Sequence, residues 1–343
     1  MTLLVTGASG FLGGALVEAL VARGERVRTL QRSKGERLAR LERESVVENV
    51  LASVEDAAAV RRACEGVRAV FHVAAKAGMW GGYDAYFRAN VLGTRHVIEG
   101  CRAASVPILV HTSSPSVVHA GDDQEGIDES TPIASRHASH YSATKAIAER
   151  EVLAAHGTPR ADGGVLSTVA LRPHLIWGPG DTNLAPRILS RARRGRLVLV
   201  GGGTKKIDAT YIDSAVHAHL LAWERLAAEG PRAACAGKAY FIAQGEPTPS
   251  RDLILGIVRA HGVEPRPRSV PRPIAEALGT ATELVWRALG RADDPPLTRF
   301  VAQQLGTAHW YSLAAAERDL GYRAPITTAE GLARLAAWAK DQG

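Results

Sequence analysis

A tyrosine and a lysine four residues apart, Tyr141 and Lys145, form the pair in this sequence with the clearest chemical use. On a helix, residues at this spacing lie on one face, one turn apart. A free tyrosine has a pKa of about 10, which is too high for easy proton exchange near neutral pH. A nearby ammonium favours the phenolate, so the pair predicts proton transfer to or from a substrate oxygen.

A serine cluster upstream of this pair strengthens the prediction, because Tyr-x-x-x-Lys by itself is a common pattern. The strand expected at 108–112 runs directly into Ser113, Ser114, Pro115 and Ser116. A hydroxyl at this strand end can hold a carbonyl oxygen beside the tyrosine and stabilise the charge that develops on it. In a reduction, the phenol would give its proton to that oxygen as hydride arrives at carbon.

A glycine-rich turn near the N-terminus predicts where a dinucleotide binds. An apolar strand expected at 3–6 leads into this turn, and a helical pattern follows it. Gly7 permits a tight turn, Gly10 lets the backbone approach a pyrophosphate, and Gly13 lets the helix pack closely on the strand. The helix N-terminus adds N–H groups and partial positive charge. The residues expected to contact the cofactor here are Gly7, Ser9, Gly10, Phe11, Leu12 and Gly13.

The end of the second expected strand distinguishes between the two nicotinamide cofactors. An NAD enzyme needs a carboxylate there to accept hydrogen bonds from the ribose hydroxyls. This chain has Gln31, Arg32 and Ser33 instead. The Arg32 guanidinium is suited to pair with a 2′-phosphate, so the sequence favours NADP(H). The alternative is that Arg32 is only a surface residue and that the choice of cofactor is relaxed.

Short apolar stretches alternate with helical patterns over the first two-thirds of the chain, as in a parallel sheet covered by helices on both faces. After a loop at 173–181, a proline-rich stretch at 265–273 leads into a helix with an apolar stripe, which we expect in the core. That stripe is Ile274, Leu278, Ala281, Leu284, Val285 and Leu289. Strands are expected at 3–6, 26–30, 69–74, 108–112, 168–172 and 239–242.

The predicted fold is therefore α/β, a Rossmann doubly wound parallel sheet with a smaller C-terminal substrate lobe. Residues 1–180 are expected to form the NADP-binding domain, with 209–245 returning to it. Residues 181–208 and 246–343 are expected to form the substrate-binding lobe.

Composition narrows the class of protein further. An apolar fraction of 46% and a charged fraction of 22% are those of an ordinary globular protein. Three widely spaced cysteines, Cys64, Cys101 and Cys235, argue against a disulfide framework and suit a reducing, cytoplasmic location. We expect neither a signal peptide nor a membrane span, because the N-terminus reads as a buried strand and no long apolar run follows.

The net charge of +7 is modest, and its densest cluster reads as a solvated helix end. A site for an anionic substrate is the less favoured alternative. Nucleic acid is not expected, because no aromatic residues interleave with the basic ones. No metal is expected either, because no H-E-x-x-H pattern or close Asp/Glu/His cluster is present. The cluster consists of Arg191, Arg193, Arg194 and Arg196.

Taken together, the G-x-x-G-x-x-G turn, the upstream serines and the Tyr-x-x-x-Lys pair resemble the extended short-chain dehydrogenase/reductases of the NAD-dependent epimerase/dehydratase superfamily. The resemblance covers nearly the whole chain. Stretches 71–81, 112–117 and 172–181, with 296–299 and 309–311, are most similar to the 3β-hydroxysteroid dehydrogenase-like branch. Within that branch they resemble the bacterial 2-alkyl-3-ketoalkanoate reductases of olefin biosynthesis.

This resemblance implies roles for further residues. It implies that Ser114 is the catalytic serine, with Ser113 and Ser116 as open alternatives. It implies that Asn90 organises the lysine through water, although Asn90 is almost as easily read as a tie for loop backbone. His72 reads as structural. The implied cofactor contacts are Ser53 (where relatives commonly carry an aspartate), Val54, Ala74, Ala75, Lys76, Tyr141, Lys145, Pro173, Leu175 and Ile176, and the implied substrate contacts are Trp80, Ser114, Ser116 and His174.

The branch also implies a small hydrophobic carbonyl or alcohol substrate, and a homodimer. Met79, Trp80 and the apolar helix are candidates for a hydrophobic pocket. The leading hypothesis is NADPH-dependent reduction of the 3-keto group of a 2-alkyl-3-oxoalkanoate-like substrate. A 3β-hydroxysteroid dehydrogenase or another specialised-metabolite ketoreductase would share these residues. A nucleotide-sugar epimerase or dehydratase and, least favoured, a non-catalytic NADP sensor also stay open.

Overall fold

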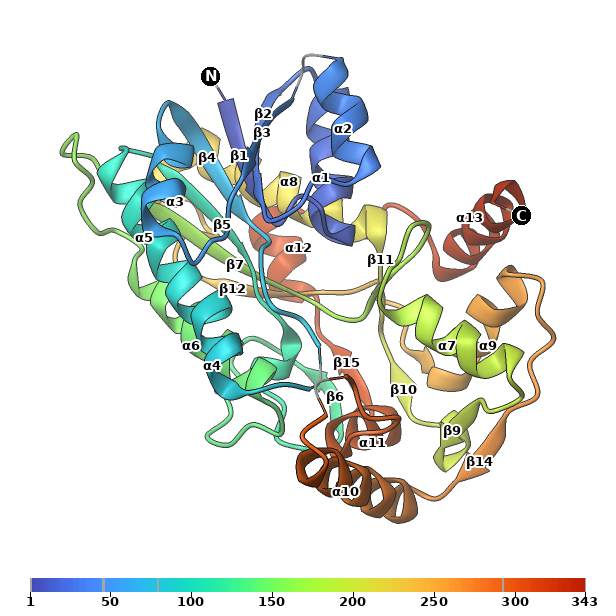
Figure 1. The fold of residues 1–343 in the computed structure, drawn as a ribbon. Helices are drawn as coiled ribbons and strands as arrows, with labels where there is room; N and C mark the ends of the chain where they lie inside the picture. Colours follow the sequence, from blue (N-terminus) through green and yellow to red (C-terminus); the bar gives the residue numbers. More distant parts are fainter. Residues whose placement is uncertain (1, 45–46, 79, 292, 343) are drawn as a thin grey trace.

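A parallel sheet of seven strands, in the order β12-β7-β5-β4-β1-β2-β3, forms the centre of the computed structural model, which describes residues 2–44, 47–78, 80–291 and 293–342 (Figure 1). The chain runs outward from β1 to β3 and then crosses to β4 on the other side of β1, which confirms the predicted doubly wound fold. The strands are β1 (Thr2–Thr6), β2 (Arg26–Gln31), β3 (Val47–Leu51), β4 (Val67–His72), β5 (Ile108–Thr112), β7 (Ser167–Pro173) and β12 (Ala239–Ile242).

Helices cover both faces of this sheet. Leu3 and Val5 pack into one core and Leu4 into another, because successive side chains of a strand point to opposite faces. The first core is closed by α1 (Phe11–Ala22), α2 (Glu36–Arg43), α8 (Ile212–Glu229) and α12 (Ala314–Leu320), and the second by α3 (Ala57–Cys64), α5 (Gly93–Ala103) and α6 (His140–Ala154). Between β4 and α5 lie α4 (Tyr83–Tyr86) and a π-helix, η1 (Phe87–Leu92).

A smaller group of elements lies beyond the carboxyl ends of the strands (Figure 1). Its main sheet has the order β13-β10-β15-β6, in which β6 comes from the first half of the chain. The strands are β6 (Gln124–Ile127), β8 (Ile176–Trp177), β9 (Val198–Val200), β10 (Lys206–Ile207), β11 (Thr210–Tyr211), β13 (Thr248–Pro249), β14 (Arg268–Val270) and β15 (His309–Tyr311). The helices are α7 (Leu184–Arg193), α9 (Ser250–Ala260), α10 (Arg272–Ala288), α11 (Arg299–Gly306) and α13 (Thr328–Asp341), and the short 3-10 turns are η2 (Pro115–Val117), η3 (Gly201–Gly203) and η4 (Gly230–Arg232).

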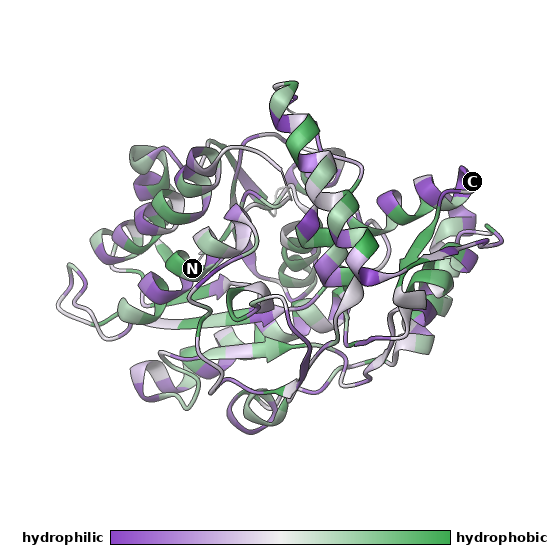
Figure 2. Cartoon of the chain, turned by 90° about the horizontal axis from the view of Figure 1, so that it is seen from below, coloured by the Kyte–Doolittle hydropathy of each residue, from purple (hydrophilic) through white to green (hydrophobic). Residues whose placement is uncertain are grey.

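The apolar stripe of α10 was expected in the core, and that expectation is wrong. Ile274, Leu278 and Leu289 are exposed by 53%, 52% and 65% of their surface. The opposite side of the helix packs instead, because its small residues allow a close approach: a Cβ on Gly279 would lie 2.7 Å from the backbone nitrogen of Arg299. Figure 2 shows the molecule from the side on which α10 lies. The stripe therefore builds no substrate pocket within the described structure.

The longest helices in the described ranges are not apolar enough to cross a lipid bilayer.

Candidate active site

The glycine turn after β1 has the close backbone contacts that a phosphate-binding loop requires. Gly7 has φ +71°, and a Cβ there would lie 2.7 Å from the Cα of Ala74. The N–H of Gly10 donates to the carbonyl of Gly7 at 2.9 Å, and Gly10 caps α1 without a side chain. The first N–H groups of α1 are thus left open to an anion, with Ser9 exposed beside them. Phe11 is half-buried and Leu12 is buried under the turn.

Gly13 offers a test of this loop. An added Cβ would lie 2.3 Å from the carbonyl oxygen of Gly7, so Gly13→Ala forces the turn to shift. Overpacking of this kind costs about 1–3 kcal/mol, and we expect dinucleotide affinity to fall roughly 5- to 150-fold. Fluorescence titration with NADPH measures the loss. Gly35→Ala is the matched control, because its Cβ meets no described atom within 4 Å. Equal affinity of the two variants would contradict this function of the turn.

At the end of β2, polar groups are available for the adenosine part of a cofactor. Gln31 is buried and donates from Nε2 to the Oδ1 of Asn49 at 3.1 Å, while its own Oε1 has no hydrogen-bond partner among the described residues. Arg32 is exposed and makes no hydrogen bond or ion pair with any residue that the structure describes. A buried acceptor and an uncommitted guanidinium at this edge can bind hydroxyl and anionic groups.

Ser53 and Val54 follow β3 at the same edge of the sheet. The Ser53 hydroxyl accepts from the N–H of Glu55 at 3.2 Å, so it is engaged in its own turn. Val54 is buried, and its carbonyl oxygen lies 3.0 Å from the Nδ1 of His96. The backbone of this turn is therefore held in place by His96, which lies on α5.

The loop after β4 is held against the phosphate loop by buried side chains. His72 is fully buried between Thr6 and Thr94, with Nδ1 2.8 Å from one hydroxyl and Nε2 3.0 Å from the other. The Thr6 hydroxyl also accepts from the N–H of Ala74 at 3.1 Å. Burial, together with the charge of Lys145, lowers the pKa of His72 to about 3. His72 is thus a neutral structural residue, as the sequence indicated, and Ala75 beyond it is exposed.

Asn90 lies in the π-helix η1 and is buried. Its Oδ1 accepts from the N–H of Lys76 at 2.7 Å, and its Nδ2 donates to the carbonyl of Lys76 at 3.2 Å and to Thr144 at 3.0 Å. These contacts tie the backbone of the loop at Lys76 to α6. They match the role of a tie for loop backbone, which the sequence analysis weighed against organisation of the lysine through water. The Lys76 ammonium lies over the ring of Tyr86, 5.1 Å from its centroid.

Ser114, Ser116 and Tyr141 come together at the carboxyl end of β5. Helix α6 begins at His140 behind a Ser139 cap, so Tyr141 lies in its first turn. The hydroxyls of Ser114 and Ser116 are 3.0 Å apart. The Ser114 hydroxyl also lies close enough to the Tyr141 phenol to favour its ionised form. Ser113 is directed elsewhere and donates to the carboxylate of Glu149 at 2.5 Å. Of the three serines considered, Ser114 is the one in contact with the phenol.

Lys145 is 2% exposed, one turn below Tyr141. Its Nζ donates to the carbonyl of Thr112 at 2.7 Å and lies 3.1 Å from Nε2 of His111. Burial lowers the pKa of Lys145 to about 7, and Glu149 opposes this lowering. Sequence reasoning did not find His111 or Thr112 as partners of the lysine, although both belong to the strand that carries the serines.

The expected lowering of the tyrosine pKa is absent from the protein alone. Burial raises the pKa of Tyr141, and the nearby Ser114 hydroxyl opposes the rise. In the protein alone, the Lys145 ammonium donates to the carbonyl of Thr112 and lies beside His111. The positive charge of an oxidised nicotinamide would also favour the phenolate, and it acts only in the cofactor complex.

The segment after β7 is strained where it leaves the sheet. Pro173 ends β7, and Leu175 has φ +42°, which is unusual for a non-glycine residue and common at ligand-binding sites. Ile176 begins β8 and is half-buried. His174 is buried, with Nδ1 2.8 Å from the carbonyl of Asp208 and its ring packed edge-on against Tyr311. The His174 imidazole is thus engaged by the Asp208 carbonyl and the Tyr311 ring.

Trp80 is linked to the far end of α10. Its Nε1 donates to the carbonyl of Arg291 at 3.0 Å, and the guanidinium of Arg287 lies over its ring. This contact joins the loop between β4 and α4 to the smaller lobe. Met79, which the sequence also offered as a candidate for the hydrophobic pocket, lies outside the described residues.

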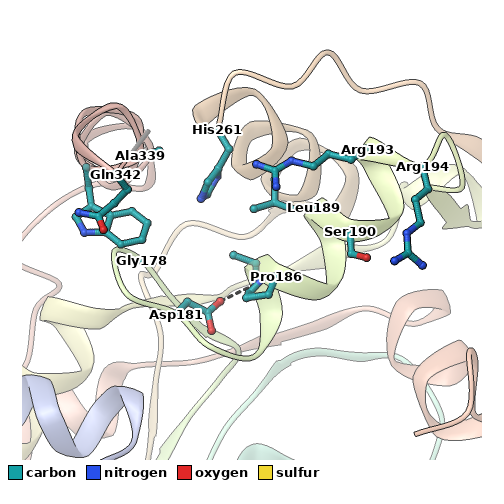
Figure 3. Close-up of a pocket in the computed structure, with 12 residues that line it drawn as sticks. Gly178, Asp181, Pro186, Leu189, Ser190, Arg193, Arg194, His261, Ala339 and Gln342 are labelled. Atoms are coloured by element: carbon teal, nitrogen blue, oxygen red, sulfur yellow. Dashed lines mark hydrogen bonds between the residues drawn. The ribbon is translucent and has the colours of Figure 1, made fainter. Parts of the chain in front are cut away.

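A cavity of about 580 Å³ lies elsewhere, between α7, the end of α9 and α13 (Figure 3). Arg193 and Arg194 line it, and Arg193 points toward His261. None of the residues predicted to be catalytic or to bind cofactor or substrate lines this cavity. No cluster of three or more potential metal ligands occurs in the part of the chain described here.

Comparisons with known proteins agree with this geometry. The profile of the 3-beta hydroxysteroid dehydrogenase/isomerase family matches residues 4–272. The chain is 48% identical to a 2-alkyl-3-oxoalkanoate reductase of Stenotrophomonas maltophilia, over 98% of this chain and 99% of that protein. It is 44% identical to a protein of the same name from Shewanella oneidensis, over 97% and 85% of the two chains.

Among solved structures, the chain is similar to a double mutant of dTDP-glucose 4,6-dehydratase from Streptomyces venezuelae with NAD bound. The TM-score is 0.75 at 25% identity, and the match covers 99% of this chain and 97% of that one. The structural similarity thus extends over both the main sheet and the smaller lobe.

Proposed function

Since this chain belongs to the 3-beta hydroxysteroid dehydrogenase/isomerase family, and is an oxidoreductase of the extended short-chain type, we propose that it reduces the 3-keto group of a hydrophobic 2-alkyl-3-oxoalkanoate with NADPH. One observation carries the proposal: Ser114, Tyr141 and Lys145 converge at the end of β5 in a chain that matches a named reductase of this kind along nearly its whole length. The geometry supports a carbonyl substrate, and the similarity supports its class.

The residues available to the cofactor fit a nicotinamide dinucleotide. Gly7 and Gly13 lie so close to neighbouring backbone that a Cβ at either would collide with it, as a tight phosphate-binding turn requires, and Gln31 has an unpartnered buried oxygen at the ribose end. Gly10 and the start of α1 would hold the pyrophosphate. We assign the 2′-phosphate to Arg32. The reduced nicotinamide supplies the hydride when it is bound.

The chain itself would position the ketone and supply the proton. Ser114, supported by Ser116, donates a hydrogen bond to the carbonyl oxygen and stabilises the negative charge that develops there. Tyr141 donates its phenolic proton to the same oxygen, so the product leaves as an alcohol. Lys145 holds a positive charge below the phenol and lowers the cost of the phenolate that remains.

Initial rates of NADPH and NADH oxidation, with a 2-alkyl-3-ketoacid and a 3-ketosteroid offered separately, test the proposal. We expect turnover of the ketoacid with a strong preference for NADPH. Turnover of the steroid alone would keep the mechanism and replace the substrate, as the family description allows. Inactivity on both substrates, with NAD retained in the purified protein, would contradict the proposal and favour a nucleotide sugar.

A further inference from the structure

Glu149 lies at the centre of a buried network that the mechanism above does not use. It is 0% exposed, on α6, one turn after Lys145. Its carboxylate accepts two hydrogen bonds from the guanidinium of Arg172, at 2.9 and 2.6 Å, and one from Ser113 at 2.5 Å. Arg172 is itself buried on β7 and lies over the ring of Phe241. Charged groups so far from water need such partners, so the site is costly to build and specific in its geometry.

The network also reaches the strand end that carries the catalytic serine. Helix α6 holds two consecutive residues there: Lys145 donates to the carbonyl of Thr112, and Glu149 accepts from the hydroxyl of Ser113. The N–H of Ser113 donates to β7 at 2.6 Å. Ser114 follows directly. The helix that carries Tyr141 therefore also fixes the place of Ser114 relative to it.

The charges around the lysine make Glu149 necessary in a second way. His72 and His111 face Lys145 from β4 and β5, and burial keeps the pKa of each well below its usual value, so both are neutral. His219 on α8 lies 2.8 Å from the hydroxyl of Thr112, whose carbonyl accepts from Lys145. Burial lowers the pKa of His219 to about 4. Arg172 adds a second buried cation. Glu149 is thus the carboxylate that balances the positive groups of this part of the structure. The titratable groups of this network, on the elements packed around Lys145, are His72, His111, Tyr141, Glu149, Arg172 and His219.

We propose, on the premise of the reductase function, that Glu149 is a positioning residue that keeps Lys145 charged in its buried site and, through Ser113, holds Ser114 beside Tyr141. A buried ammonium without an opposite charge gives up its proton readily. Consistent with this role, Glu149 is the group that opposes the lowering of the Lys145 pKa. Loss of the carboxylate should let Lys145 become neutral at a lower pH.

Lysine side-chain NMR tests this directly and needs no substrate. The chain has only seven lysines, so the signal of Lys145 in protein labelled with ¹³C at lysine Cε can be assigned with Lys145→Met. In Glu149→Gln we expect its titration midpoint to fall by about one pH unit relative to wild type. The alkaline limb of kcat for ketone reduction should move to lower pH by a similar amount.

Two further variants keep the test decisive. Glu149→Gln leaves Arg172 buried without its partner and can fail to fold, whereas Glu149→Met combined with Arg172→Met replaces the pair by apolar side chains, which proteins often tolerate. The double variant should shift the midpoint in the same direction but by less, because it removes the Arg172 cation as well. Glu151→Gln is the control, because Glu151 lies on the same helix and pairs with Arg95 at the surface. It should leave the midpoint unchanged.

An unchanged midpoint in the folded Glu149 variants would overturn the proposal, as would a loss of kcat that is equal at every pH, since that is the mark of a purely structural residue. Failure of the reductase function is a separate result. It would appear as a wild-type protein that turns over no ketoacid, while the NMR titration would still report on Lys145.

Discussion

Replacement of Tyr141 by phenylalanine is expected to lower kcat for ketone reduction by about 10²- to 10⁴-fold, the usual contribution of a positioned general acid. Phenylalanine keeps the ring in the first turn of α6 and removes only the hydroxyl that contacts Ser114. Among the described residues, no other phenol forms a hydrogen bond with Ser114 or Ser116. Steady-state kinetics with saturating NADPH measure the effect.

The matched control separates loss of chemistry from loss of structure. Tyr240→Phe also removes a buried phenol. Tyr240 lies on the edge strand β12 and donates to Asp319 at 2.7 Å. We expect this variant to retain most of the activity. Both variants should bind NADPH with wild-type affinity, as judged by fluorescence titration. Near-normal turnover by Tyr141→Phe would eliminate Tyr141 as the proton donor and leave the assignment of Ser114 without support.

The main sheet was largely predictable because its signals are local. Six strands were expected from short apolar stretches, and the structure has strands at all six positions. The seventh, β3, was not among them. Its sequence, Val47–Leu51, includes a glutamate and an asparagine, because β3 is the edge strand and is partly exposed. An edge strand lacks the continuous apolar run by which a central strand is recognised.

Helix α10 shows the limit of periodicity as a signal. The pattern correctly predicts a helix with an apolar side, but it cannot tell which side a neighbour will cover. The close approach of α11 depends on Gly279, and that small side is the one that packs. The apolar side chains consequently remain outside.

In the active site, sequence spacing placed Tyr141 and Lys145 on one helix face, and the structure agrees. What the spacing could not give is the surroundings of the lysine. Its partners Thr112 and His111 come from β5, and Arg172 comes from β7, so their proximity depends on strand order. The burial that lowers the pKa of Lys145 is likewise a property of the whole packed layer. Long-range contacts of this kind leave no trace in local patterns.

The change of cofactor preference is the second large effect that we expect. Arg32→Glu should lower the ratio of kcat/KM with NADPH to that with NADH by at least about 100-fold. Hydrogen bonds to a charged partner are worth about 1.5–3 kcal/mol, and a carboxylate in the same place adds repulsion toward a phosphate. The same carboxylate can accept hydrogen bonds from the ribose hydroxyls of NADH, so activity with NADH should rise.

Arg32 is well suited to this experiment because its replacement should disturb nothing else. The side chain is exposed and has no hydrogen bond or ion pair with the described residues, so a changed ratio reports on the cofactor and not on the fold. Arg232→Glu, an exposed arginine in η4, controls for the change in net charge. Arg32→Lys should fall between wild type and Arg32→Glu, because an ammonium keeps the charge but loses the bidentate geometry. If the three Arg32 proteins share one ratio, Arg32 is only a surface residue, and the discrimination must come from another group near the ribose, with the unpartnered oxygen of Gln31 as the first to examine.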